Sequence, residues 1–464
     1  MSNIKIVFDK KYKGEFIPNG MSENLRTQYV NFIDTIGNSE NFSYEYFKKT
    51  NLHFSYNNIS SASGIMNTFS KSEFVLTSDL HDSTDLFLDR EDVRFLYYIG
   101  TSGNIHNGLN IFNINQNPSY FENLPDNVIK HLKTKNNFYL YIDQVQEGIT
   151  DAVIEKIYLD CLKYGIKTSK VILSSDTINF DDLKKIVEVK YTCKIDIKYF
   201  MIPWALFQAS NFLEELYETN NIVTDFSKNR KYSFLCFNRK LKDSRILMIS
   251  FLLGKNYNGL LSYDTNYIEN LNFEQDTIKF LNPKYSDVLK VGFKKMLETK
   301  KSIIDVNSYE NHNALIIDNK KLYEESYFSI VTETSTYYDQ IRFTEKIFKP
   351  IINYHPFIVF GPPHILEKIK MYGFKTFSDF WDESYDLETD RFKRFEKITN
   401  IIDDLVTMSE NKWDDLIEKM QDILIHNRNV LKNYLYSLKV DEFKNNLNLL
   451  TDDKFHNKNY SILK

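Results

Sequence analysis

Residues 327–377 constrain the fold more than any other part of the chain. Short apolar runs rich in β-branched and aromatic side chains are typical of buried strands, and this stretch holds three of them, at 327–332, 356–360 and 374–377. A helix is predicted after each of the first two runs: one that begins behind the N-cap candidate Thr344, and one at 364–372. A strand–helix–strand–helix–strand order predicts half of a doubly wound α/β domain.

The carboxyl ends of these strands predict a binding site. In a doubly wound domain, ligands bind beyond the strand ends, where helix N-termini present free N–H groups. Glu333 follows the first strand, and Glu345 and Lys346 open the first helix. We therefore expect these side chains to lie at the binding edge.

The same alternation runs through much of the remaining chain. Strands are expected at 74–77, 95–99, 137–142, 171–174 and 199–202, with a helix at 150–164. They predict a first Rossmann-like domain over 61–219, behind an N-terminal segment, 1–60, to which no role is assigned. A second Rossmann-like domain is expected over 232–400, after a polar linker at 220–231. C-terminal helices are expected over 401–464, with amphipathic patterns at 389–408 and 411–438.

Two such domains indicate a GT-B architecture, in which two Rossmann-like domains face each other across a cleft. In the second domain, residues 233–237 form the expected first strand, and Arg245 lies in the first turn of the helix expected at 246–253. A cation in that position opposes the helix dipole unless an anion binds there.

Composition excludes several other classes of protein. The net charge of −5 argues against a generally basic nucleic-acid-binding surface. The amino terminus lacks the apolar core of a signal peptide, and no apolar run approaches the ~20 residues of a membrane span. Three widely spaced cysteines, Cys161, Cys193 and Cys236, suggest free thiols in a reducing compartment. We expect a cytoplasmic protein.

Motifs in the second domain resemble the donor-site block of α1,3-fucosyltransferases. The matching segments are Ser329-Ile330-Val331-Thr332-Glu333-Thr334-Ser335, Phe343-Thr344-Glu345-Lys346-Ile347 and Pro356-Phe357-Ile358-Val359-Phe360-Gly361. The segment at 234–239, with Arg245 on the next helix, is similar to the family's other donor-binding segment. Residues 231–385 carry this resemblance.

The chain is also similar to glycosyltransferase-like proteins of large tailed phages. These combine a Leu-Asn-Arg segment with a Thr-Glu-Lys block and a Gly-Phe-x-Thr-Phe ending, here residues 373–377. Phe237 replaces the leucine of the first motif, and Thr334 stands where the fucosyltransferase pattern has asparagine, which leaves the identity of the sugar open.

The resemblance implies a set of donor-binding residues. A departing nucleoside diphosphate needs cations or helix N–H groups to stabilise its charge. Arg245 and Lys346 match that requirement, and Arg239 is a further phosphate contact by resemblance, each against the alternative of a solvated surface cation. The implied donor set is Arg239, Arg245, Glu333, Thr344, Glu345 and Lys346. Glu345 would accept from the ribose hydroxyls, and a favourable first-turn carboxylate is its alternative. Glu333 would hold the sugar or the nucleotide, and a structural salt bridge is its alternative.

The catalytic base is expected from the first domain. Glu147, Asp143 and Asp79 follow predicted strands, where a carboxylate can accept a hydroxyl proton; His81 and Asp82 are rivals, and a turn or capping role is the alternative for each. No two aspartates are separated by a single residue, so we predict no metal and no cofactor beyond the nucleotide sugar as co-substrate.

The sequence therefore predicts a glycosyltransferase that moves a sugar from a nucleotide sugar to an acceptor hydroxyl. The acceptor is either a glycan or a hydroxymethylated base of phage DNA. The alternative is a non-catalytic nucleotide-binding or virion-associated protein that keeps a degenerate glycosyltransferase domain.

Overall fold

The chain divides into two compact units, each built on its own β-sheet. Unit 1 comprises Met1–Trp204 and Ser437–Lys464, and unit 2 comprises Ala205–Tyr436. The computed structural model describes residues 3–8, 74–76, 93–100, 126–144, 148–203, 230–238, 241–268, 277–302, 320–434 and 460–461, together with 121, 124 and scattered residues within 205–226.

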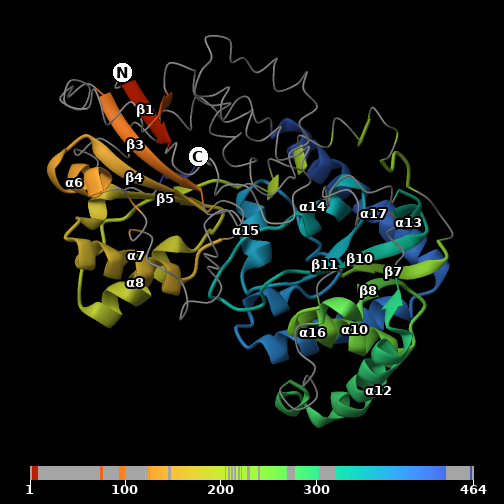
Figure 1. The fold of residues 1–464 in the computed structure, drawn as a ribbon. Coiled ribbons are helices and arrows are strands. Elements are labelled where there is room, and N and C mark those ends of the chain that lie inside the picture. The colour runs from red at the N-terminus through yellow and green to blue at the C-terminus, as the bar shows by residue number, and fades with distance from the viewer. Residues whose placement is uncertain are drawn as a thin grey trace, which may run out of the picture. The chain divides into compact units, whose positions relative to one another are not determined.

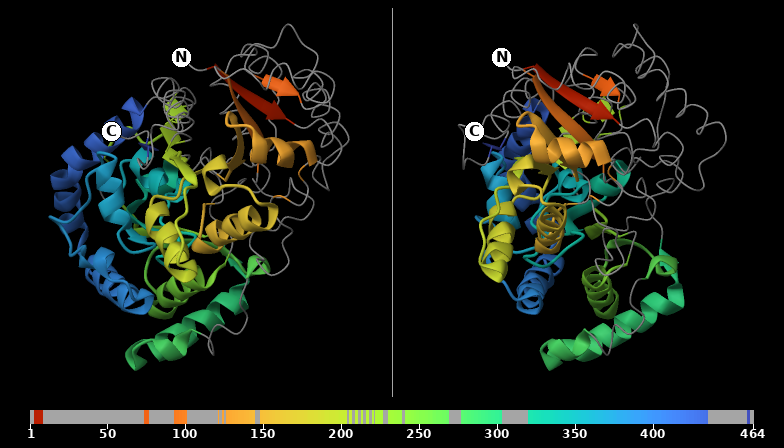
Figure 2. Two further views of the ribbon diagram at one scale, coloured as in Figure 1. Left: turned by 90° about the vertical axis from the view of Figure 1, so that its left-hand side faces the viewer. Right: turned by 60° about the vertical axis from the view of Figure 1, so that its left-hand side comes forward.

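Unit 1 contains a seven-stranded parallel sheet in the order β12-β6-β5-β4-β3-β1-β2. Its strands are β1 (Asn3–Phe8), β2 (Phe74–Leu76), β3 (Val93–Gly100), β4 (Phe138–Asp143), β5 (Val171–Ser175), β6 (Lys198–Met201) and β12 (Tyr460–Ser461). The helices α6 (Asp126–Thr134), α7 (Asp151–Tyr164) and α8 (Phe180–Tyr191) accompany them, and α7 and α8 pack side by side (Figures 1 and 2). Every residue of β5 is buried, which is typical of a strand inside a parallel sheet.

Unit 2 contains a five-stranded sheet in the order β11-β10-β7-β8-β9. Its strands are β7 (Tyr232–Phe237), β8 (Leu260–Asp264), β9 (Lys301–Ser302), β10 (Ser326–Thr332) and β11 (Phe357–Phe360). All pairs are parallel except β8 with β9. The chain begins in the middle of this sheet at β7, builds one side with β8 and β9, and then crosses to the other side with β10 and β11.

Helices cover both sides of this second sheet (Figure 1). These are α10 (Asp243–Lys255), α12 (Pro283–Thr299), α13 (Lys320–Glu324), α14 (Glu345–Ile352), α15 (Ile365–Met371), α16 (Arg391–Val406) and α17 (Glu410–Asn433). The helices α10 and α16 lie on one side, where Phe251 and Phe395 meet edge to face with ring centroids 5.9 Å apart, and α14 contacts α17 on the other side. The parallel sheets with flanking helices confirm the predicted α/β class.

Glycines allow α10 and α12 to pack closely. A Cβ atom on Gly292 would lie 1.7 Å from the carbonyl oxygen of Ser250, and one on Gly254 would lie 2.0 Å from that of Val288. The two backbones therefore approach to a distance at which no side chain fits between them. The helix α12 is therefore an integral part of unit 2.

The prediction of a strand at 374–377 is wrong. This segment is irregular, and side chains satisfy its backbone in place of a neighbouring strand. The Asn427 side-chain amide of α17 accepts from the Lys375 N–H at 2.8 Å and donates to the Lys375 carbonyl at 2.9 Å. Phe374 and Phe377 are both buried, so the aromatic residues of this segment mark a buried but irregular stretch of chain.

The unit boundaries differ from the predicted ones. The division falls at Trp204 and Ala205, whereas 222–226 and 230–231 of the predicted linker belong to unit 2, where Arg230 is buried and donates to the Ser326 carbonyl at 2.6 Å. The segment 1–60 contributes β1, which lies between β3 and the edge strand β2 in the unit 1 sheet. Within 401–464, α17 packs in unit 2 while the last residues join unit 1, so this range is no separate element.

Candidate functional site

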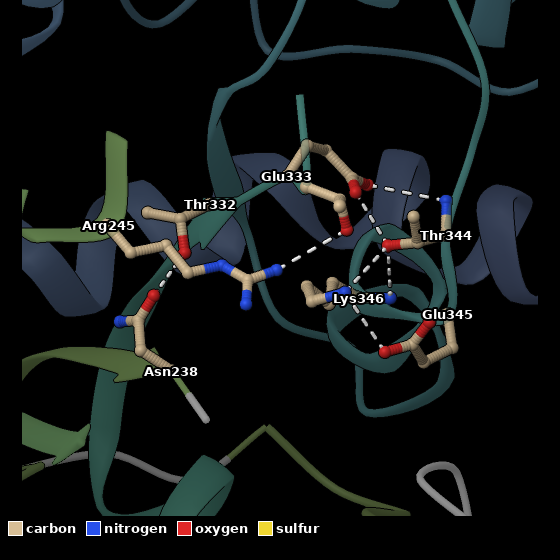
Figure 3. A network of polar contacts seen from close by, with 8 residues as sticks. Asn238, Arg245, Thr332, Glu333, Thr344, Glu345 and Lys346 are labelled. Atoms are coloured by element: carbon tan, nitrogen blue, oxygen red, sulfur yellow. Dashed lines mark hydrogen bonds and ion pairs between the residues drawn. The ribbon is translucent and has the colours of Figure 1, made fainter. Parts of the chain in front are cut away.

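The change of direction between β7 and β10 creates the candidate site. Because the two strands are neighbours, the segments that leave their carboxyl ends diverge, one toward β8 and the other toward β11. In open α/β sheets this topological switch point is where ligands bind. Four elements meet there: the ends of β7 and β10, and the first turns of α10 and α14 (Figure 3).

Polar side chains fix the two strand ends to each other. Asn238, directly after β7, is buried, and its side-chain oxygen accepts from the Thr332 hydroxyl at the end of β10 at 2.5 Å. The Asn238 amide group donates to the Cys236 sulfur at 3.2 Å, and its backbone N–H donates to the Ser262 carbonyl at 2.9 Å. These hydrogen bonds fix the positions of the strand ends relative to one another.

Arg245 enters the site from α10. It is 4% exposed although it carries a full charge, and its Nη2 donates to the Thr334 hydroxyl at 3.4 Å. The N-cap residue of this helix, Lys242, makes no side-chain hydrogen bond to the first turn. The start of α10 therefore combines a buried cation with the positive end of the helix dipole.

Glu333 is the first residue after β10 and is 1% exposed. Its Oε2 accepts from the Thr344 hydroxyl at 2.6 Å, and its Oε1 faces the Thr344 N–H at 3.5 Å. Burial raises the pKa of Glu333, whereas the charges of Lys346 and Arg245 and the bond from Thr344 oppose that rise. In Figure 3, Arg245 and Lys346 lie on different sides of this carboxyl group.

The first turn of α14 holds the other charges. Thr344 caps the helix by accepting from the Lys346 N–H at 3.4 Å, and the Lys346 ammonium donates to Thr344 Oγ1 at 3.2 Å and to Glu345 Oε1 at 3.1 Å. Burial disfavours the charged form of Glu345, but the adjacent ammonium groups of Lys346 and Lys349 outweigh it and lower the pKa of Glu345 to about 2. Glu345 is therefore ionised at neutral pH.

The first turn of the neighbouring helix α15 is satisfied by a carboxylate of the protein itself. The Asp386 carboxylate accepts from the Leu366 N–H at 2.9 Å and from the Glu367 N–H at 3.0 Å, so an internal anion already occupies its first turn. A carboxylate from outside the helix thus accepts from the first-turn amides of α15, whereas α14 is capped by Thr344 and α10 has no side-chain cap.

The structure thus brings together five of the six predicted donor residues: Arg245, Glu333, Thr344, Glu345 and Lys346. Arg239 lies outside the described residues. Sequence reasoning missed the Asn238–Thr332 pair, for which the signal was a polar residue at the end of each apolar strand. It also missed Asp386, whose distance of 20 residues from Leu366 left no local signal.

The predicted base candidates belong to unit 1. Asp143 is the last residue of β4, with its side chain outside the described part, and Asp79 and Glu147 also lie outside the described residues, as do His81 and Asp82. The register that pairs Asp143 with Ser174 places a further acidic residue, Asp176, at the same strand edge. Asp176 is 4% exposed and follows β5 directly, so it joins the candidates.

The described residues contain neither a metal-site cluster nor a membrane-spanning helix. No group of three or more His, Cys, Asp or Glu side chains there has the arrangement of a metal site. No helix in that part of the chain has both the length and the apolar character needed to cross a membrane. No family model matches the chain, and no similar sequence was found among curated proteins.

Proposed function

We propose that the protein is a GT-B-type glycosyltransferase that moves a sugar from a nucleotide-sugar donor to an acceptor hydroxyl, with unit 2 as the donor domain. One observation carries the proposal: Arg245 and Lys346, on two different helices, converge on the carboxyl edge of the sheet at its switch point. Two cations and two helix N-termini at one place suit a ligand that carries several adjacent negative charges.

The proposed chemistry assigns distinct tasks to these residues. As the bond between the sugar and the diphosphate breaks, negative charge accumulates on the leaving oxygen, and Arg245 and Lys346 stabilise it. The ionised Glu345 accepts hydrogen bonds from the ribose hydroxyls. The β7–α10 turn lacks the glycine-rich pattern of a dinucleotide-binding loop, which favours a mononucleotide diphosphate over NAD.

Acceptor activation is proposed for unit 1. A carboxylate of unit 1, chosen from Asp79, Asp143, Glu147 and Asp176, would take the proton of the acceptor hydroxyl. The acceptor is a glycan or a hydroxymethylated base of DNA. For a DNA acceptor, the modified base has to be extruded from the double helix before its hydroxyl group can react.

Thermal unfolding with a panel of nucleoside diphosphates tests the donor site. A ligand present at 100 times its Kd adds about 2.7 kcal/mol to the free energy of unfolding, which raises the melting temperature. A panel that leaves the melting temperature unchanged would refute the donor site.

Turnover then separates an enzyme from a binding protein. The stabilising nucleotide identifies the base, and its nucleotide sugars are incubated with glycans or with hydroxymethylated DNA while diphosphate release is measured. Release that depends on one acceptor class identifies the substrate. Binding without release on any acceptor would favour the non-catalytic nucleotide-binding or virion-associated alternative.

A further inference from the structure

Glu333 is an unusual neighbour for an anion site, because it places a buried negative charge behind the groups that would bind the phosphates. Only 1% of the residue is exposed, so water does not solvate its carboxylate. The charged groups that act on it are Arg245 from α10, and Lys346 and Glu345 from α14. Without a ligand, Glu333 and Glu345 balance the two cations.

The hydrogen bonds describe the ionised form of Glu333. Thr344 Oγ1 accepts from the backbone N–H and the ammonium group of Lys346, so its own proton points to Glu333 Oε2, 2.6 Å away. Oε1 makes the longer contact, 3.5 Å to the Thr344 N–H, and therefore has the weaker hydrogen bond. A proton added to Oε1 leaves the Thr344–Oε2 bond intact.

A bound diphosphate changes this balance. It brings several negative charges to the same cations, and a like charge nearby favours the neutral form of a buried carboxyl group. Burial already acts on Glu333 in that direction, and the cations that oppose it would then be shared with the phosphates. Glu345 differs because its pKa of about 2 leaves a wide margin before it protonates.

We propose that Glu333 is the internal counterion of the empty anion site and takes up one proton from solvent when a nucleoside diphosphate binds to Arg245 and Lys346. The proton goes to Oε1, no other bond forms or breaks, and the proton returns to solvent when the ligand leaves. Glu333 acts as a positioning residue that keeps the two cations in place before the ligand arrives. This inference rests on the proposed donor site.

Isothermal titration calorimetry of the full chain measures the proton directly. A nucleoside diphosphate that stabilises the protein is titrated at one pH into buffers of different ionisation enthalpy, and the slope of observed enthalpy against ionisation enthalpy gives the protons taken up. We expect the wild type to take up as much as about one proton more than Glu333→Gln, whose amide is neutral in both states. The diphosphate's own ionisation cancels in this difference.

Glu367→Gln is the matched control, since it removes a first-turn carboxylate of α15, outside the proposed donor site, and the hydrogen bond from Lys368 lowers the pKa of that carboxyl group. We expect it to keep the proton uptake of the wild type. Equal proton uptake by the wild type and Glu333→Gln would overturn the inference while leaving the donor site standing. If no diphosphate binds to the wild type, the donor site itself fails, and the inference with it.

The pH dependence of affinity provides a second readout, which needs only the wild type if Glu333→Gln does not fold. Between about pH 8 and pH 9 the terminal phosphate, whose last pKa is about 6, is almost fully ionised, and an ordinary lysine, with a pKa of about 10.4, remains largely protonated. We expect the Kd of the wild type to rise with pH over this range by up to about tenfold per unit, because the complex must hold a proton that becomes scarcer. A Kd that stays constant or falls would contradict the proposal.

Discussion

The helices α14 and α15 begin in comparable places but differ in what their first turns contain. Each follows a strand of the same sheet, β10 or β11. The Asp386 carboxylate accepts hydrogen bonds from two backbone N–H groups in the first turn of α15. The first turn of α14 instead contains Lys346, and it lies close enough to Arg245 for both cations to act on Glu333. A helix start that the protein satisfies internally needs no ligand. The first turn of α14, which has two cations nearby, is the one that we propose to bind an anion.

The largest expected effect comes from removing both cations. Arg245→Ala combined with Lys346→Ala deletes two charge-assisted contacts, each worth about 1.5–3 kcal/mol, so diphosphate affinity should fall at least 100-fold. Calorimetric titration measures the loss. Lys368→Ala on α15 is the matched control, because its side chain is 23% exposed against 21% for Lys346 and it too pairs with a glutamate. Equal losses in both proteins would remove the distinction between the two helices.

Asp386→Ala should have the opposite profile. It leaves the Leu366 and Glu367 amides without their acceptor, which should cost about 2 kcal/mol in the free energy of unfolding. Diphosphate affinity should not change. Urea unfolding measures the first quantity, with Asp382→Ala as the control, since that carboxylate caps an exposed turn at Ser384. A loss of affinity without a loss of stability would mean that α15 belongs to the binding site.

The two helix starts should also differ in acid. The pKa of Glu345 is lowered to about 2, so its contribution to stability is present above the unfolded value of 4.5 and is lost as pH falls toward 2. The pKa of Asp386 is raised from 3.8, chiefly by burial, so the folded state holds that proton more tightly. The free energy of unfolding therefore rises as the pH falls toward the unfolded pKa of 3.8. Carboxyl NMR titration should show Asp386 protonating at higher pH than Glu345; the reverse order would contradict this assignment.

The smallest expected effect is at Gly361, which lies between the two helix starts. A Cβ there would lie 3.3 Å from Glu333 Cγ and 3.1 Å from Ile365 Cδ1, so each neighbour has to move by a few tenths of an ångström. Gly361→Ala should therefore lower the free energy of unfolding by about 1 kcal/mol. Urea unfolding measures it. A shift confined to diphosphate affinity would show that Glu333 yields more easily than the core around Ile365.

Much of the site followed from local patterns. Thr344 was predicted as an N-cap, and Lys346 and Arg245 were placed in the first turns of two helices, as the structure shows. The prediction of a strand at 374–377 failed because buried aromatic residues such as Phe374 and Phe377 also occur in irregular segments. Here the partner of the intervening backbone is a side chain of α17.

The sequence by itself determined the α/β alternation, the helix starts and the residues at the strand ends, because periodicity and capping act over a few neighbouring residues. Only the tertiary structure decided that β7 lies beside β10, which brings Asn238 to Thr332 across 94 residues and sets Arg245 and Lys346 around one carboxylate. It also decided that the Asp386 carboxylate accepts from the first-turn amides of α15. Strand order and burial depend on contacts between distant segments, which no local pattern encodes.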